Sequence, residues 1–282
     1  MIRRPPPASG GRWVDLHAHT YFSDGLLSPE ALVERALQRG LAAIAVTDHD
    51  SVEGVPRARA AAGNQLEVVP GIEISSAEDG QDLHILGYYL DTGHAPLGQR
   101  LKRFQDERGD RARAIVQRLE GQGIAIDAEA MLAAAGPGVV GRPHVAAALV
   151  AGGFVVDSEE AFRRYLGIRG SAYVPRPAFR PEAAIALLHA ANGISVLAHP
   201  GPAVSDRLLE RLVEVGLRGI EVWHPLHGAA LVRRYRALAQ RLDLVETGGS
   251  DFHGQPRGAD LGDLGVPIAV LDRLKQMAGV SG

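Results

Sequence analysis

The stretch Asp15-Leu16-His17-Ala18-His19-Thr20 ends the first β-rich run of the chain, which begins at Trp13. Because side chains alternate along a strand, His17 and His19 project from the same face of this run. Two imidazoles in that arrangement can bind one metal ion. The His-x-His pattern alone is a weak signal, so a metal site requires further ligands elsewhere in the chain.

Further β-rich runs also end in acidic or imidazole side chains. These ends are Asp48-His49-Asp50, Glu73, His199, and Asp251 with His253. In barrels and open α/β sheets, active sites form at the carboxyl ends of the parallel strands. We therefore expect these side chains to meet at one rim of the sheet.

Two more candidate ligands lie away from strand ends. Asp24 stands in a Ser-Asp-Gly turn, where Asp often serves only the turn. His84 stands near the start of a strand, where a core histidine with satisfied hydrogen bonds is an equally good interpretation. Either residue becomes a metal ligand only if the fold carries it to the rim.

The β-rich runs alternate with helical patterns, which predicts an α/β fold with a mainly parallel sheet. Ser28-Pro29 begins a helix with a capping Ser followed by Pro, and Gly40 ends it. The other strands are expected at 41–47, 66–73, 83–90, 194–199, 219–223 and 244–249, and further helices at 181–192, 206–215 and 229–241.

Residues 96–172 show helical spacing and no convincing strand, with short helices expected at 131–135, 143–150 and 158–166. About 75 residues without a strand are too many for one crossover, which favours a helical insertion over ordinary barrel helices. The basic residues between 100 and 113 alternate with acidic ones, which predicts a solvated helix face. We expect a barrel domain from 13–95 and 173–282, a helical lid domain from 96–172, and a mobile tail at 1–12.

Composition excludes several classes of function. The chain of 282 residues has no cysteine, which excludes disulfides, zinc-thiolate sites and thiol nucleophiles and is compatible with the cytoplasm. A formal net charge of −3 argues against a duplex-DNA-binding surface. Neither a run of about 20 apolar residues nor a secretory leader is present, so we expect no membrane partner.

Nine candidate ligands exceed what one metal can use, because a catalytic zinc takes three protein ligands and leaves one position open. They are His17, His19, Asp24, His49, Glu73, His84, His199, Asp251 and His253. With Glu73 shared, they suffice for two or three divalent metal ions. Imidazole and carboxylate without sulfur suit manganese, iron or zinc, with manganese the first expectation.

Six motifs together resemble those of the polymerase-and-histidinol-phosphatase (PHP) superfamily. They are Asp15–Thr20, Thr47–Asp50, Gly71–Ser75, Leu83–Gly87, Ala198–Gly201 and Gly249–His253, in the family's order. The resemblance implies a distorted (β/α)7 barrel with a trinuclear metal site. By position, it implies one metal on His17, His19, Glu73 and Asp251, a second on Glu73, His84 and His199, and a third on Asp24, His49 and His253.

The helical stretch resembles the insertion of the subgroup that acts on nucleotides and cyclic phosphates. In that subgroup an Arg-Thr/Pro-His element contacts phosphate, and here it corresponds to Arg142-Pro143-His144. Relatives often carry Lys or Arg at the position of Gly170, three residues before Tyr173. Arg169 is the nearby cation that would have to replace it.

These features predict a metal-dependent phosphoesterase, in which the metals activate water and neutralise the phosphoryl oxygens. Arg142 would clamp a phosphate, His144 or His199 would protonate the leaving oxygen, and His227 is a candidate substrate contact. A nucleotide substrate is favoured: a nucleoside 3′,5′-bisphosphate losing its 3′-phosphate, or a short single-stranded oligoribonucleotide cut from its 5′ end.

Three alternatives remain open. A histidinol-phosphate phosphatase is disfavoured by the long helical insertion. A non-catalytic metal-binding accessory module is disfavoured because all nine ligand positions are filled. Hydrolysis of carbon–nitrogen bonds on a related barrel would be separated by testing amide against phosphate substrates.

Overall fold

The structure is a computed structural model that describes residues 12–134, 138–254 and 258–280. Its strands are β1 (Trp13–Asp15), β2 (Ala43–Val46), β3 (Glu67–Glu78), β4 (Gln81–Tyr88), β5 (Ile194–Leu197), β6 (Gly219–Trp223), β7 (Val245–Gly248) and β8 (Val266–Pro267). The tail predicted at 1–12 lies, except for residue 12, outside the described residues, as does the last residue of the helix predicted at 131–135.

All strands belong to one sheet in the order β7-β6-β5-β4-β3-β2-β1-β8. Its two ends approach each other, because the Leu16 N–H donates to the Gly248 carbonyl at 3.2 Å and Ala18 forms a parallel bridge with Phe252. The approach is close: a Cβ added at Gly249 would lie 2.4 Å from the Cβ of His17. The sheet is thus a nearly closed barrel, which confirms the predicted distorted α/β barrel.

The third and fourth strands depart from the expected strand-helix-strand order. β3 continues to Glu78 instead of ending at residue 73, and Asp79 and Gly80, both at positive φ, turn the chain directly into β4. β4 is antiparallel to β3 and to β5. The beginning of β4 therefore lies at the level of the carboxyl ends of the parallel strands, which carries His84 to the rim.

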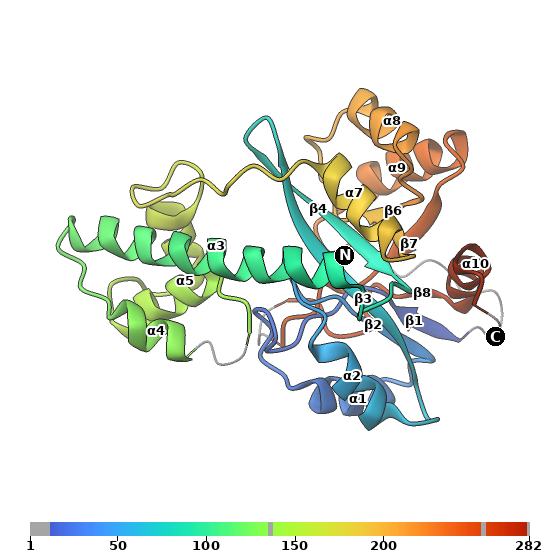
Figure 1. Ribbon diagram of the computed structural model, residues 1–282, viewed down its shortest axis with the longest axis horizontal. Coiled ribbons are helices and arrows are strands. Elements are labelled where there is room, and N and C mark those ends of the chain that lie inside the picture. The colour runs from blue at the N-terminus through green and yellow to red at the C-terminus, as the bar shows by residue number, and fades with distance from the viewer. Residues whose placement is uncertain (1–11, 135–137, 255–257, 281–282) are drawn as a thin grey trace.

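Helices cover the outside of the barrel (Figure 1). α1 (Pro29–Gln38) and α2 (Gly54–Ala62) pack together on one side, whereas α7 (Pro181–Ala190), α8 (Asp206–Glu214) and α9 (Ala229–Arg241) cover another, and α10 (Ile268–Ala278) lies beside β1 and β7. α2 and α10 were not predicted from the sequence, and both begin without a side-chain cap.

The insertion between β4 and β5 projects from the barrel (Figure 1). It contains α3 (Ala95–Glu120), α4 (Ala128–Ala134), α5 (Arg142–Ala151), α6 (Ser158–Ala161) and a π-helix (Phe162–Leu166). Leu97, Leu101 and Phe104 of α3 pack in the same cluster as α7, whereas Ile115 and Leu119 belong to a separate cluster with α4 and α5. The helix α3 therefore connects the barrel to a second hydrophobic core.

The insertion also contacts the loop that follows β1. The N–H of Val139 in the insertion donates to the Phe22 carbonyl at 3.0 Å, two residues before Asp24. The insertion thereby touches the loop that carries a candidate ligand.

Within the described ranges, no helix has the length and apolar character needed to cross a membrane.

Candidate metal centre

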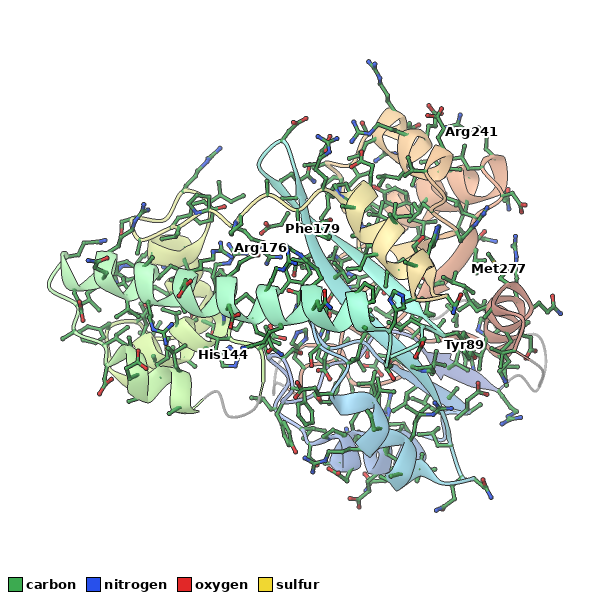
Figure 2. All side chains as sticks on the ribbon, in the orientation of Figure 1. Tyr89, His144, Arg176, Phe179, Arg241 and Met277 are labelled. Atoms are coloured by element: carbon green, nitrogen blue, oxygen red, sulfur yellow. The ribbon has the colours of Figure 1, made fainter. Side chains whose placement is uncertain are left out.

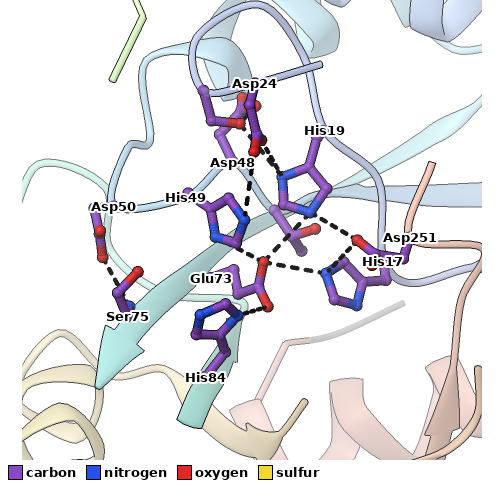
Figure 3. A network of polar contacts seen from close by, with 12 residues as sticks. His17, His19, Asp24, Asp48, His49, Asp50, Glu73, Ser75, His84 and Asp251 are labelled. Carbon is purple, nitrogen blue, oxygen red and sulfur yellow. Dashed lines mark hydrogen bonds and ion pairs between the residues drawn. The ribbon is translucent and has the colours of Figure 1, made fainter. Parts of the chain in front are cut away.

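The rim of the barrel gathers all nine predicted ligands into one polar cluster. Figure 3 labels all of them except His199 and His253. The donor atoms fall into four overlapping groups, and within each group they lie within 4.8 Å of one another. The groups are His19, Asp24, His49 and His253; His17, His19 and Glu73; His17, His199 and Asp251; and His49, Glu73 and His84. Residues from or directly after six strands, and one turn residue, thus converge on a single site.

Glu73 lies at the centre of this cluster and has no exposed surface (Figure 3). Its Oε2 atom is 3.3 Å from Nε2 of both His17 and His19 and 2.9 Å from Nδ1 of His49. Its Oε1 atom is 2.8 Å from Nδ1 of His84 and 2.9 Å from Nε2 of His199. The two oxygens therefore face different groups of imidazoles, as a bridging carboxylate requires.

The other two carboxylates serve opposite sides of the cluster. The Oδ1 atom of Asp251 lies 3.3 Å from Nε2 of His17 and 3.2 Å from Nε2 of His19. Asp24 lies 3.2 Å from Nε2 of His253 and 3.9 Å from Nε2 of His49. These distances are compatible with the three ligand sets implied by the resemblance. His49 faces both Asp24 and Glu73, so its assignment to a single metal stays a prediction.

Several donor atoms of the cluster are buried without a hydrogen-bond partner. They are Nε2 of His17, Nε2 of His19, Oδ1 of Asp24, Nδ1 of His49 and Oε2 of Glu73. Buried polar atoms are normally satisfied, so a group of unsatisfied ones calls for a missing partner. Imidazole nitrogens and carboxylate oxygens are ligands of divalent transition metals, so bound cations would supply the partners that these five atoms lack.

Crowding of these groups shifts their pKa values in opposite directions. Burial, together with His253, lowers the pKa of His19 to about 3. Burial acts the same way on His253, but the nearby Asp24 and Asp251 outweigh it and raise the pKa of His253 to about 10. The surrounding imidazoles likewise overcome burial and hold the pKa of Glu73 well below its usual value. Such opposed shifts are typical of functional sites.

The backbone at the rim is held in uncommon conformations. His199 and Asp251 have φ values of 22° and 51°, and Asp50, which follows His49, has a φ of 51°. Residues with a side chain rarely adopt positive φ, and such strain collects at functional sites. The sharp turns direct the side chains of these strand ends over the mouth of the barrel.

Buried carboxylates beneath the ligands were absent from the predicted site. Oε1 of Glu221 lies 3.0 Å from Nδ1 of His17, and its Oε2 accepts the backbone N–H of His199 at 2.8 Å. Asp15 accepts the backbone N–H of His17 at 3.2 Å, and Asp48 accepts the N–H of Thr20 at 2.6 Å. Glu221 could have been found from sequence, because a charged residue inside the apolar run 219–223 needs a buried partner.

A cluster of arginines adjoins the predicted metal ligands. Its residues are Arg108, Arg111, Arg142, Arg176, Asp50 and Asp82, and we call it the arginine cluster. Nη2 of Arg108 lies 2.7 Å from Oδ2 of Asp50 and donates to Oγ of Ser75 at 2.8 Å. Nη2 of Arg142 donates to Oδ2 of Asp82 at 3.0 Å. Figure 2 labels Arg176 beside α3, where the chain returns to the barrel.

Two guanidinium groups of the arginine cluster are incompletely paired. Nη2 of Arg111 and both Nε and Nη1 of Arg176 are buried without a hydrogen-bond partner. Burial, reinforced by the neighbouring arginines, lowers the pKa of each to about 10, so both remain charged at neutral pH. Unpaired buried cations are costly, and an anion between them would remove that cost.

The prediction of a solvated face for residues 100–113 was wrong for Arg108 and Arg111. Both guanidinium groups point inward, and the side chain of Arg111 is buried. The spacing carried this signal, because residues 101, 104, 108, 111 and 115 form one helical stripe with apolar residues at three of its positions. An arginine on a buried stripe indicates a paired or ligand-binding cation.

The predicted substrate contacts lie in different environments. His144 lies in the first turn of α5, its Nδ1 accepts the Gly141 N–H at 3.1 Å, and it is close enough to Asp24 to interact electrostatically. Arg169 is exposed after the π-helix. His227 is fully buried, with Nδ1 3.0 Å from the Val222 carbonyl and Nε2 accepting a backbone N–H, so its ring supports a loop.

His199 had been assigned both a ligand and a proton-donor role. Its Nε2 atom lies 2.9 Å from Glu73 and belongs to the group with His17 and Asp251. A nitrogen that binds a metal has no proton to donate. The geometry therefore supports His199 as a ligand.

Comparison with known proteins places the chain in a family. The PHP domain profile matches residues 15–166. The chain is 35% identical over 265 residues to the 5′-3′ exoribonuclease Rnm of Salmonella typhimurium, over 91% of this chain and 90% of that protein. It is 35% identical over 253 residues to the 3′,5′-nucleoside bisphosphate phosphatase of Chromobacterium violaceum, over 87% of this chain and 88% of that one.

A solved structure agrees with these sequence relatives. The crystal structure of a Bifidobacterium adolescentis protein, provisionally assigned as a metal-dependent phosphoesterase, matches with a TM-score of 0.90 and 31% identity. The match covers 97% of this chain and 98% of that protein. The chain therefore belongs to the PHP domain family, as its six motifs implied.

Proposed function

We propose that the chain is a metal-dependent phosphoesterase that removes the 3′-phosphate of nucleoside 3′,5′-bisphosphates. The observation that carries this proposal is the position of the arginine cluster beside the metal ligands. Glu73 and Ser75 alternate on one face of β3, as do His84 and Asp82 on β4. Alternate residues of a strand lie about 7 Å apart, a span comparable to that of a ribose between its two phosphates.

The nine ligands would hold the catalytic metals. We propose the ligand sets implied by the resemblance, with two to three ions per chain and manganese the first expectation. Bound divalent cations supply a Lewis acid that activates water and neutralises the phosphoryl oxygens. Orphaned donor atoms in the cluster support this proposal, because they are of the type that such cations bind.

His144 supplies a hydrogen bond to the reacting phosphate or leaving oxygen. Its Nδ1 accepts the backbone N–H of Gly141, so the proton of the neutral ring lies on Nε2. Burial lowers the pKa of His144, and this effect outweighs the opposing influence of Asp24. The ring is therefore mostly neutral at pH 7 and acts as an N–H donor.

The arginine cluster anchors the phosphate that is not cleaved. Arg142, Arg111 and Arg176 would bind it through guanidinium N–H groups. The helical segment 96–172, proposed as a lid domain, brings two of these three arginines to the rim. Binding at such an anchor orients the reacting group, so a substrate that lacks it loses turnover as well as affinity.

A second activity uses the same site. The relative from Salmonella typhimurium is a 5′-3′ exoribonuclease, and the arginine cluster would bind the 5′-terminal phosphate of a short single-stranded oligoribonucleotide. Histidinol phosphate has one phosphate and would leave the anchor empty. Neither alternative requires a different set of metal ligands.

The proposal is tested by comparing four substrates under identical manganese and pH. Adenosine 3′,5′-bisphosphate is expected to exceed adenosine 3′-monophosphate and 5′-monophosphate by at least about 10-fold in kcat/KM, if the anchor contributes ~1.4 kcal/mol. Histidinol phosphate is the fourth substrate. Equal rates on mono- and bisphosphates, or a preference for histidinol phosphate, would refute the two-phosphate site.

A further inference from the structure

Asp82 holds an unusual position for an acidic residue at an anion site. Its carboxylate accepts a hydrogen bond from Nη2 of Arg142 at 3.0 Å, and 28% of its side chain remains exposed. The contact is an ion pair between a carboxylate and a guanidinium, the ordinary pairing of aspartate with arginine. A negative charge therefore stands where the substrate's second phosphate is proposed to bind.

The charges of the arginine cluster do not balance without a ligand. Four guanidinium groups face the carboxylates of Asp50 and Asp82, which leaves two positive charges in excess. A phosphate monoester carries a charge of about −1.5 to −2 near pH 7. The excess thus matches one phosphate, and unpaired N–H groups of Arg111 and Arg176 remain to bind it.

The two carboxylates of the cluster are differently placed. Asp50 is fully buried, lies 2.7 Å from Arg108, and accepts the backbone N–H of Ser75 at 2.8 Å, so it is fixed within the fold. Asp82 is partly exposed and contacts Arg142, which is itself 19% exposed. Only the Asp82–Arg142 pair can separate without breaking a backbone hydrogen bond that involves the carboxylate.

We propose that Asp82 is a built-in counter-ion of the anion site. In the free enzyme Asp82 pairs with Arg142 at the position of the second phosphate. When a phosphorylated nucleotide binds, this ion pair separates and Arg142 contacts the phosphate. Once the phosphate is bound, the two negative charges repel, which keeps the affinity for the product nucleotide low. The identity of the ligand rests on the proposed function.

A purely structural role for Asp82 makes the opposite prediction. If Asp82 served only to hold Arg142 in position, its loss would disorder the guanidinium and weaken phosphate binding. If it competes with phosphate, its loss strengthens binding, because like charges close together oppose each other at low dielectric. The sign of the change in affinity therefore decides between the two roles.

The test is the affinity of manganese-loaded protein for 5′-AMP, measured by isothermal titration calorimetry. Asp82→Asn is expected to lower the Kd at least about 10-fold, equivalent to ~1.4 kcal/mol. Asp79→Asn removes the same charge from an exposed residue of the same hairpin, where Asn also tolerates the positive φ, and should leave the Kd unchanged. Adenosine, which has no phosphate, should bind both variants as it binds the unaltered protein.

Further measurements exclude other origins of the effect. Metal content, measured on every variant, must stay the same, since Asp82 is two residues from His84. In an Arg176→Met background, Asp82→Asn should give a smaller gain in affinity than in the unaltered protein, whereas an equal gain in both backgrounds would place the phosphate on the metals and overturn the proposal. An unchanged or higher Kd in Asp82→Asn, or no binding of 5′-AMP by any variant, would also overturn it. Tighter 5′-AMP binding without bisphosphate hydrolysis would refute the proposed reaction and leave the counter-ion intact.

Discussion

Glu221 lies 3.0 Å from Nδ1 of His17, and neither side chain has any exposed surface. Since Nδ1 faces this carboxylate, His17 presents Nε2 to Glu73 and Asp251, each at 3.3 Å. The second oxygen of Glu221 accepts the backbone N–H of His199. One buried carboxylate therefore orients two of the proposed ligands from different strands, and such contacts raise the basicity of a metal-bound imidazole.

Replacing Glu221 with Gln should lower metal affinity by about 10- to 100-fold, the usual effect of removing a carboxylate behind a ligating His. The size of the side chain is conserved, so the loss would come from charge. Competition with a chelating dye measures the manganese affinity. Glu246→Gln on β7, whose carboxylate pairs with Arg236 at 3.0 Å, is the matched control. Equal affinities in the two variants would show that Glu221 only fills space.

Glu73→Gln should be the most damaging change among the ligands. Both oxygens of Glu73 face imidazoles from different groups, so the substitution weakens two metal positions together. We expect loss of at least about one metal equivalent and the largest fall in turnover of any single ligand variant. Glu78→Gln, at the far end of the same strand, is the control. Near-normal turnover and metal content in Glu73→Gln would disprove the bridging role.

The reconstituted protein should hold two to three equivalents of transition metal by elemental analysis. Removing the metal with a chelator should lower the melting temperature, because ligands that bind only the folded state stabilise it and because five buried donor atoms lose their partner. Differential scanning fluorimetry with and without manganese measures this shift. One equivalent or less after reconstitution would contradict the cluster of metals.

Arg142→Ala should reduce kcat/KM for the 3′,5′-bisphosphate by about 10- to 100-fold, since a charge-assisted bond contributes roughly 1.5–3 kcal/mol. Adenosine 3′-monophosphate, which lacks the second phosphate, should be much less affected, and metal content should not change. Arg113→Ala removes an exposed arginine of the same insertion that pairs with Glu129, and serves as control. Unchanged kinetics would transfer the anchoring role to Arg111 and Arg176.

The sequence by itself was enough to indicate the barrel and to group the predicted metal ligands. Metal ligands must be a few residue types, and the carboxyl ends of parallel strands meet at one rim, so His17, Glu73, His199 and Asp251 could be placed together from local pattern alone. The direction of β4 could not be predicted from the local pattern of residues. His84 reaches the rim because β3 turns directly into β4, which depends on the hairpin at Asp79 and Gly80.

Only the tertiary structure decided which residues pair in the arginine cluster and which predicted ligands Glu221 contacts. Arg108 meets Asp50, 58 residues away in sequence, and Arg142 meets Asp82 at a separation of 60. No local periodicity specifies such pairs, because they form only when the insertion folds against the barrel. The sequence thus determined which side chains are available as metal ligands, whereas the packing of distant elements determined where the second phosphate of the proposed substrate would bind.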